Sequence, residues 1–171
     1  MDIHGVNIRL ADRSDVDAMA DAHRDSIQSV GAPYYPVDVV AGWLAGIAGE
    51  LYLDAMDRGE VFFIATGNVN GKTLVLGFSS DYPIEGATHG TSVYVRGQAA
   101  RRGVGTALLR RAEAHAIAAG AAAVRIEASL AGAVFYKVNG YVEVGRGEIR
   151  LLSGHPIPCV FMRKSLTPGG C

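Results

Sequence analysis

The sequence is poor in cysteine, in charged residues and in long apolar runs. Its 171 residues include two cysteines, Cys159 and Cys171, and 19% of the chain is charged. Two cysteines are too few for a disulfide framework and lie in no metal-ligand spacing, so we interpret both as reduced structural thiols and expect no metal. No apolar run reaches the roughly 18 residues that a membrane span needs. We therefore expect a soluble globular protein.

The chain also lacks the features of a signal peptide. The start, Met1-Asp2-Ile3-His4, has neither a basic segment nor an apolar one, so we expect the protein in the cytoplasm. Sixteen basic against 17 acidic residues give a net charge of −1, which argues against nucleic-acid or membrane partners. The balance is locally uneven, because residues 86–112 contain five arginines and no acid: Arg96, Arg101, Arg102, Arg110 and Arg111.

Hydrophobic periodicity predicts a mixed α/β fold. Helical spacing is found in four regions, at Val16–Val30, Pro36–Met56, Val104–Ala119 and Gly132–Val138. Strand patterns are found in seven, at Val6–Leu10, Glu60–Thr66, Thr73–Tyr82, Thr88–Val95, Ala123–Ala128, Tyr141–Leu151 and Pro158–Leu166. No linker or repeat interrupts the chain, so we expect residues 1–171 to form a single domain.

A loop rich in glycine and arginine precedes the predicted long helix. It reads V-R-G-Q-A-A-R-R-G-V-G from Val95 to Gly105. Unpaired N–H groups converge at the positive start of a helix, and glycines at 103 and 105 let a ligand approach the main chain closely. The pattern predicts a phosphate site. The alternative is a solvated basic loop with a glycine N-cap.

Two common phosphate motifs fit this loop poorly. A P-loop needs Lys and then Ser or Thr directly after its last glycine, and here Val104 follows Gly103. A dinucleotide fingerprint has a small third position, which is Leu108 here, although Glu127 lies at a suitable distance for a ribose contact. Nucleotide binding therefore stays a distant alternative.

Two segments carry a resemblance to a known family. Val93-Tyr94-Val95, followed by R-R-G-V-G-T-A-L-L from Arg101, resembles motif A of the GNAT superfamily of acetyl-CoA-dependent N-acetyltransferases. The segment from Glu127 to Tyr141 is similar to motif B of that superfamily. The resemblance covers about residues 61–144, and Tyr35-Pro36 followed by Trp43 is seen in one branch of uncharacterised bacterial members. One position departs, because Ala100 stands where the family has Gln or Arg.

The resemblance implies a fold, a cofactor and a reaction. The fold is a mixed, mostly antiparallel sheet of six to seven strands with a central parallel pair and about four flanking helices. The reaction is direct attack of a primary amine on acetyl-CoA, with a main-chain N–H near Val93–Val95 facing the oxyanion. The implied cofactor-binding residues are Val93, Tyr94, Val95, Gln98, Arg101, Arg102, Gly103, Val104, Gly105, Thr106, Ser129 and Tyr136.

The resemblance also suggests catalytic residues. Tyr136 is the candidate proton donor to the coenzyme A sulfur, and its alternative is a core aromatic. His89 stands where many members carry a glutamate base, with Asp81 and Glu85 as alternatives and an ordinary strand residue as the bland reading.

Other residues are candidates for the acceptor pocket or for the core. Tyr34, Tyr35, Trp43 and Asp81 are assigned to an acceptor pocket, although the aromatics fit a core cluster equally well. His23 is interpreted as a core histidine, and Cys159 is a poor nucleophile candidate.

Function can be read from these residues in two ways. The first is an N-acetyltransferase for an unidentified amine, carried by a small molecule or a peptide. The second is a non-catalytic acyl-CoA-binding or sensing module on the same fold, which Ala100 and the absence of a clear glutamate base keep open. Late strands in this family often build dimers, so a homodimer is one expected assembly.

Overall fold

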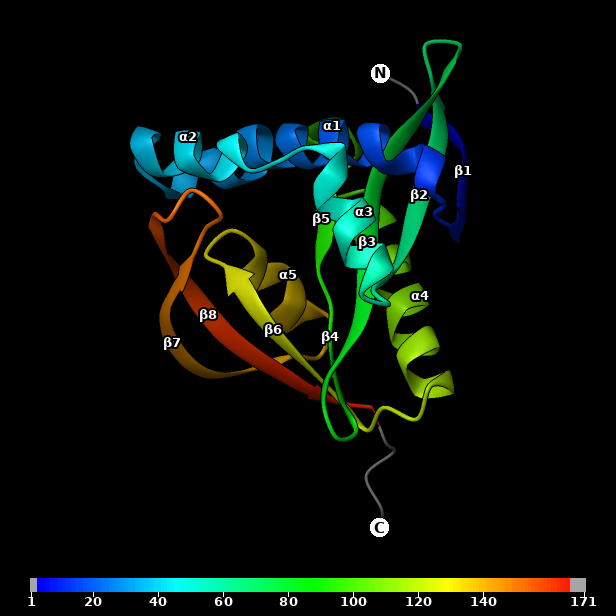
Figure 1. The fold of residues 1–171 in the computed structure, drawn as a ribbon. Coiled ribbons are helices and arrows are strands. Elements are labelled where there is room, and N and C mark those ends of the chain that lie inside the picture. The colour runs from blue at the N-terminus through cyan, green and yellow to red at the C-terminus, as the bar shows by residue number, and fades with distance from the viewer. Residues whose placement is uncertain (1–2, 167–171) are drawn as a thin grey trace.

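The computed structural model describes residues 3–166, and its strands form one eight-stranded sheet with helices on both faces (Figure 1). The strand order is β1-β2-β3-β4-β6-β8-β7, with β5 paired to β3. The strands are β1 (Ile3–Leu10), β2 (Val61–Val69), β3 (Lys72–Glu85), β4 (Thr88–Gly90), β5 (Val93–Val95), β6 (Ala123–Ser129), β7 (Val142–Arg150) and β8 (Pro156–Ser165). Pairing is antiparallel except between β4 and β6, which are parallel as expected.

Five α-helices cover the two faces of the sheet. They are α1 (Val16–Ser26), α2 (Val37–Ala45), α3 (Gly49–Asp57), α4 (Val104–Ala118) and α5 (Gly132–Val138). Helices α1 and α3 share a core with β2 and β3 on one face, whereas α4 and α5 pack on the other. Within the described residues no single helix is long and apolar enough to cross a membrane, although α2 and α3, bent by 58°, pass that test as a pair by length and composition.

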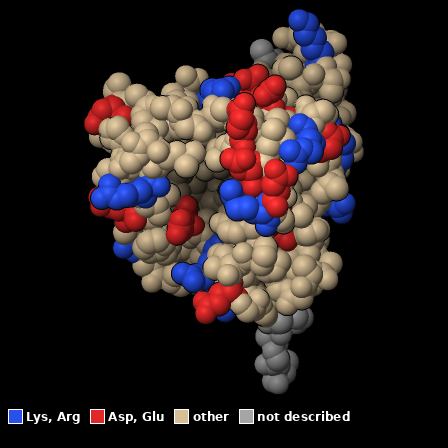
Figure 2. All heavy atoms as spheres, in the orientation of Figure 1, with Lys and Arg blue, Asp and Glu red and all other residues tan. Residues whose placement is uncertain are grey.

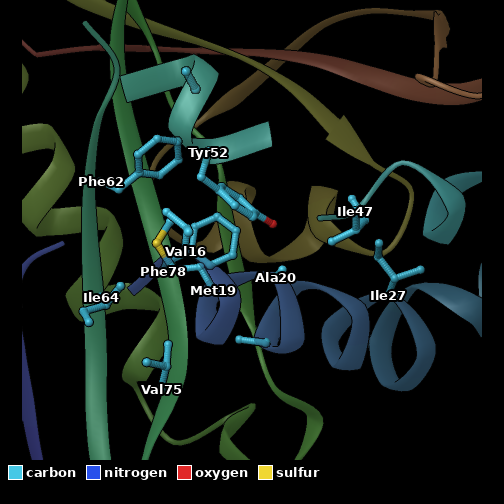
Figure 3. Close-up of a cluster of buried hydrophobic side chains, with 12 residues drawn as sticks. Val16, Met19, Ala20, Ile27, Ile47, Tyr52, Phe62, Ile64, Val75 and Phe78 are labelled. Atoms are coloured by element: carbon cyan, nitrogen blue, oxygen red, sulfur yellow. The ribbon is translucent and has the colours of Figure 1, made fainter. Parts of the chain in front are cut away.

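The core between α1, α3 and the sheet is rich in aromatic rings (Figure 3). Tyr52 of α3 meets Phe78 of β3 edge-on, with ring centroids 5.4 Å apart, and Phe62 of β2 lies 5.8 Å from Tyr52. Edge-to-face pairs contribute about 0.5–1.5 kcal/mol beyond the burial of their area. These ring contacts therefore stabilise the packing of the N-terminal helices on this face of the sheet.

His23 is a core histidine, as the sequence predicted. Its ring is 6% exposed and lies 3.7 Å from the ring of Tyr94, centroid to centroid. Nδ1 hydrogen-bonds the Tyr52 hydroxyl at 2.8 Å, and Nε2 is buried without a hydrogen-bond partner among the described residues. Burial lowers the pKa of His23 to about 3. The ring is therefore neutral throughout the physiological range.

This buried ring makes stability depend on pH. Between pH 6.5 and about 3 the unfolded chain binds a proton at His23 that the folded chain does not, so the free energy of unfolding falls as the pH falls through this window. Denaturant titrations at pH 7.5 and 5.5 are expected to show a loss about 1.4 kcal/mol larger for the wild type than for His23→Phe. Equal losses in the two proteins would contradict the buried neutral state.

The sheet splits at the point where β4 ends. The parallel register runs Thr88 to Ala123, His89 to Val124 and Gly90 to Arg125, and then stops. Beyond Thr91 and Ser92 the chain continues as β5, which pairs with β3 alone. The strands β5 and β6 therefore diverge and leave main-chain groups of β5 unpaired on that side.

Two predicted elements are divided in the structure. The expected strand Thr88–Val95 is broken into β4 and β5, which gives eight strands in place of seven. The expected helical region Pro36–Met56 is broken into α2 and α3, because the chain turns at Gly46 and resumes at Gly49. The break between β4 and β5 contributes Thr91 and Ser92 to the lining of the cavity described next.

Candidate active site

A cavity of about 840 Å³ runs through the split between β5 and β6. In the orientation of Figure 1, Figure 2 shows this face hollowed between α3 and the end of β6, with acidic side chains gathered over α3. The lining comes from the end of α1, the segment before α2, β5, the loop before α4, β6, α5 and β8. Elements distant in the sequence therefore meet around one opening.

One end of the cavity is the start of α4. Ala100, Arg101, Gly103, Gly105 and Thr106 line it. Two of them have left-handed backbones, Arg101 with φ 60° and Gly103 with φ 79°, and a Cβ at residue 103 would meet nothing within 4 Å. The first N–H groups of a helix have no partner within it, so this end offers backbone donors to an anion.

The structure gives Gly105 a second reason to be glycine. A Cβ there would lie 3.1 Å from the Phe135 ring and 3.4 Å from a Val95 methyl group. The missing side chain therefore also lets α4 pack closely against α5 and β5. Gln98, Arg102 and Val104, which were assigned to the same site, are not among the lining residues, and Val104 is 4% exposed in the core.

Two of the five arginines in the acid-free segment have other roles. The guanidinium of Arg96 donates from Nε to the Val75 carbonyl at 2.7 Å and lies 3.6 Å from Asp25. Arg111 stacks over the Phe63 ring at 5.2 Å. Within residues 3–166, Arg101 is the only arginine that lines the cavity. Fewer arginines therefore line the cavity than the sequence indicated for a phosphate site.

The middle of the cavity joins β5 to α5 by one hydrogen bond. The Val93 N–H donates to the Tyr136 hydroxyl oxygen at 3.0 Å. Tyr136 is 5% exposed, and burial raises its pKa far above the usual value for a phenol. The hydroxyl therefore keeps its proton at neutral pH, and a polar N–H and a polar O–H converge at the head of the split.

The side of the cavity facing the N-terminal helices is largely apolar. Tyr34 and Trp43, which the sequence assigned to an acceptor pocket, line it together with Val30, Pro33, Ile149, Leu151 and Ile157. Tyr35 does not line it. Its hydroxyl accepts a hydrogen bond from the Leu130 N–H at 2.8 Å and donates to the Pro158 carbonyl at 3.0 Å, so Tyr35 ties β8 to the end of β6.

His89 and Asp81 lie outside the lining of this cavity. His89 Nδ1 is 2.7 Å from one carboxylate oxygen of Asp81, and His115 Nδ1 of α4 is 2.7 Å from the other. Asp81 is 3% exposed, and His89 8%. The structure therefore places both predicted residues in a His-Asp-His cluster under α4, and neither reaches the split. Glu85, the remaining alternative base, is exposed at the end of β3 and is not a lining residue either.

Glu127 and Cys159 line the cavity, although the sequence assigned neither of them to an active site. In β6, Ile126 and Ala128 are buried against α5, so Glu127 faces the other side, toward the N-terminal helices. It is the only carboxylate among the lining residues. Burial, with a further contribution from Glu127, raises the pKa of Cys159, so its thiol stays protonated.

Ser129 and Ser92 complete the polar lining beside β6 and β5. Ser129 lines the cavity and caps α5 through Oγ, which accepts a hydrogen bond from the Gly132 N–H at 3.0 Å. Ser92 was not predicted, because its role depends on the break between β4 and β5. The alternation of buried and exposed residues along β6 could have identified Glu127 as a lining residue, once the buried face of this strand was known.

Comparisons with known proteins agree with this architecture. A GCN5-related N-acetyltransferase from Rhodopseudomonas palustris is 25% identical, with a TM-score of 0.78 over 96% of this chain and 98% of that one. The PaiA N-acetyltransferase of Thermoplasma acidophilum, solved with coenzyme A, is 18% identical, with a TM-score of 0.73 over 94% and 99%. The ribosomal-protein-alanine N-acetyltransferase of Brucella melitensis is 20% identical, with a TM-score of 0.66 over 93% and 99%.

Sequence comparison supports the same family. No curated protein sequence matches the chain significantly. The family model of the acetyltransferase (GNAT) domain matches residues 58–143, which is half of the chain and includes both sequence motifs, the split sheet and the start of α4. The chain therefore belongs to the GNAT acetyltransferase family.

Proposed function

We propose that this protein transfers the acetyl group of acetyl-CoA directly to a primary amine within a ternary complex. The observation that carries the proposal is the meeting of the Val93 N–H and the Tyr136 hydroxyl, 3.0 Å apart, inside a cavity that begins at the N-terminus of α4. A cofactor with a phosphate at one end and a thioester at the other fits this order of groups. Acetyl-CoA supplies an activated acyl group and a thiolate leaving group.

The residues present fit such a cofactor. Backbone N–H groups at the start of α4 and the guanidinium of Arg101 are donors for the pyrophosphate. We assign the Val93 N–H, which here donates to the Tyr136 hydroxyl, to the negative charge that develops on the carbonyl oxygen once the thioester enters between these two groups. We assign the Tyr136 hydroxyl, which keeps its proton because burial raises its pKa, as the donor to the departing sulfur.

The acceptor enters from the side of the N-terminal helices in this proposal. Glu127 provides one negative charge for an ammonium group, while Tyr34, Trp43 and Ile157 provide apolar and aromatic surface. We propose an acceptor in which a primary amine is attached to an apolar or aromatic body, on a small molecule or a peptide terminus.

One assay separates this proposal from the non-catalytic reading. Purified protein is mixed with acetyl-CoA and a panel of primary amines, and release of free thiol is followed together with the acetylated product. Amine-dependent thiol release supports transfer. Calorimetric binding of acetyl-CoA without turnover on any amine supports the binding or sensing module, and absence of binding contradicts both.

Arg101 allows a test of the phosphate end. Arg101→Gln is expected to raise the KM for acetyl-CoA about tenfold, since a charge-assisted hydrogen bond contributes about 1.5–3 kcal/mol. Arg110→Gln is the matched control, because Arg110 is exposed on α4 and does not line the cavity. An equal rise in both variants would indicate general attraction by the basic helix and no contact by Arg101.

A further inference from the structure

The only tryptophan of the chain, Trp43 of α2, lines the cavity on the side of the N-terminal helices. Its indole packs against the core of α1 and α3 and is only half-buried, so part of the ring remains open to the cavity. Large aromatic rings bury much apolar area when a ligand covers them. The indole is therefore the largest single surface that this side of the cavity offers to a ligand.

A close approach of the main chain fixes one side of the indole. Gly31 is the last residue of the five-residue turn Ile27–Gly31 that follows α1, and it is buried. A Cβ at residue 31 would lie 3.2 Å from Cζ3 and 3.7 Å from Cη2 of Trp43. The backbone of Gly31 has φ −81°, which any residue adopts, so the space taken by the indole is the reason for a glycine here.

Tyr35 makes a second contact with the indole. The two rings stand at 90° to each other, with their centroids 5.8 Å apart, and Tyr35 is 8% exposed outside the cavity lining. Its hydroxyl accepts from the Leu130 N–H at 2.8 Å and donates to the Pro158 carbonyl at 3.0 Å. The Tyr35 ring is therefore fixed at its far end and connects Trp43 to the strands that border the split.

The turn between β7 and β8 packs directly on α2. A Cβ at Gly42 would lie 2.7 Å from His155 Nδ1, and one at Gly46 would lie 2.9 Å from the Cβ of Leu152. Residues four apart share one face of a helix, so these two glycines let the turn approach the helix backbone. The same hairpin contributes to the cavity lining through Ile149, Leu151 and Ile157. The helix that carries Trp43 is therefore fixed relative to this hairpin.

We propose that Trp43 is a specificity-determining residue that limits the length of the acceptor's apolar body, and that Tyr35 is a positioning residue that holds the indole. The proposal rests on the proposed acetyl transfer and names the acceptors as primary amines whose apolar body ends at the indole. The reacting nitrogen must reach the thioester beside Val93 and Tyr136, so the length of the body decides whether it meets Trp43. Held by Gly31 and Tyr35, the indole does not move aside for a longer body.

Two other lining residues contribute differently. Tyr34 is 54% exposed, so its ring adds contact area at the mouth of the cavity. Glu127 supplies charge for the ammonium group, which every primary amine has, and so does not distinguish one apolar body from another.

The limit is tested with straight-chain alkylamines of increasing length, from propylamine upward. For the wild type, kcat/KM should rise with length and then fall beyond one length, since an apolar pocket discriminates by about tenfold or more for a misfitting methylene. Trp43→Leu is expected to raise kcat/KM for the amines beyond that limit about tenfold, with the KM for acetyl-CoA within threefold of wild type. Leu44→Ala is the matched control, because Leu44 is the next residue of α2, packs against the core and does not line the cavity. The control should keep the wild-type limit even where its melting temperature falls.

Two variants of Tyr35 separate positioning from general stability. Tyr35→Leu removes the ring beside Trp43 and is expected to raise kcat/KM for the longer amines about threefold, although residue 35 does not touch the acceptor. Tyr35→Phe keeps the ring and leaves the Leu130 N–H without its acceptor, so it should lower the melting temperature and keep the wild-type limit. A Tyr35→Leu variant that loses stability and keeps the wild-type limit would overturn the positioning role.

Fluorescence of Trp43 gives a readout that does not require turnover. Because Trp43 is the only tryptophan, selective excitation of tryptophan reports on this site alone. Amines are titrated in the presence of coenzyme A, which has no acetyl group to transfer. The emission of the wild type should shift to shorter wavelength and saturate, because the apolar body displaces water from the half-buried indole. In Tyr35→Leu the emission without amine should already differ from that of the wild type.

The outcomes separate this inference from the proposed function. An unchanged length limit in Trp43→Leu, with a wild type that transfers acetyl groups, overturns the specificity role and leaves the function standing. A saturable emission shift without transfer to any amine contradicts the proposed function and supports contact between the amine and Trp43. Absence of both transfer and emission shift overturns the function and this inference together.

Discussion

Replacing Tyr136 by phenylalanine is expected to lower kcat for acetyl transfer about 100-fold, with the KM for acetyl-CoA changed by less than about threefold. The hydroxyl accepts the Val93 N–H at 3.0 Å and keeps its own proton, because burial raises its pKa. Its removal takes away the donor to the departing sulfur, and the ring that packs beside Phe135 remains. Steady-state kinetics with a fixed amine measure both constants.

Tyr141→Phe is the matched control for this prediction. Tyr141 is also buried, with its ring centroid 5.5 Å from that of Tyr136, and its hydroxyl donates to Glu113 at 3.0 Å. It is not among the lining residues of the cavity. The control is therefore expected to lower stability and to leave kcat near the wild-type value. If Tyr136→Phe turned over as fast as the control, Tyr136 would have no part in proton donation.

The sequence predicted the middle of the fold well, because local signals there coincide with tertiary ones. The predicted helical regions Val104–Ala119 and Gly132–Val138 match α4 and α5, which are followed by Gly120 and Gly140, both with positive φ. Asn70 and Gly71 also have positive φ, and they form the turn between β2 and β3, which match the predicted strands Glu60–Thr66 and Thr73–Tyr82. Propensity and packing agree in these segments, so periodicity alone located them.

The candidate site was harder to predict, because it depends on where strands stop pairing. Thr91 and Ser92 lie inside the strand that the sequence predicts over Thr88–Val95, and only the structure shows that pairing with β6 ends before them. The hydroxyl of Ser92 lies 2.9 Å from that of Ser80, and this contact exists because β5 pairs with β3 in one register. Register between strands is set by tertiary packing and leaves little trace in a single sequence.

His89 illustrates a different limit. Its place in the strand matched the position at which related sequences carry a base, and strand alternation alone does not say which face it occupies. Asp81 and His115 draw it to the α4 side, opposite the N-terminal helices. The sequence therefore identified only a matching position in the strand, whereas the role of His89 depends on the hydrogen bond that its side chain makes with Asp81.

Asp81 gives the second large prediction, which concerns stability. Asp81→Leu is expected to lower the free energy of unfolding by about 3 kcal/mol, because removing one partner of a buried polar cluster leaves the others unpaired. His89, 8% exposed, would lose its Nδ1 partner, and His115 would lose the other carboxylate oxygen. For a chain of this size, the melting temperature should fall by about 6–12 °C.

Kinetics distinguish this structural role from the acceptor-binding role that the sequence suggested for Asp81. Because Asp81 lies outside the lining of the cavity, the folded Asp81→Leu variant is expected to keep the wild-type KM for both substrates. Glu85→Gln, an exposed acid four residues along β3, is the control and should change neither stability nor kinetics. A raised KM for the amine at unchanged stability would return Asp81 to the active site. Loss of stability with unchanged KM values would show that the His-Asp-His cluster stabilises the packing of β3, β4 and α4 and has no part in substrate binding.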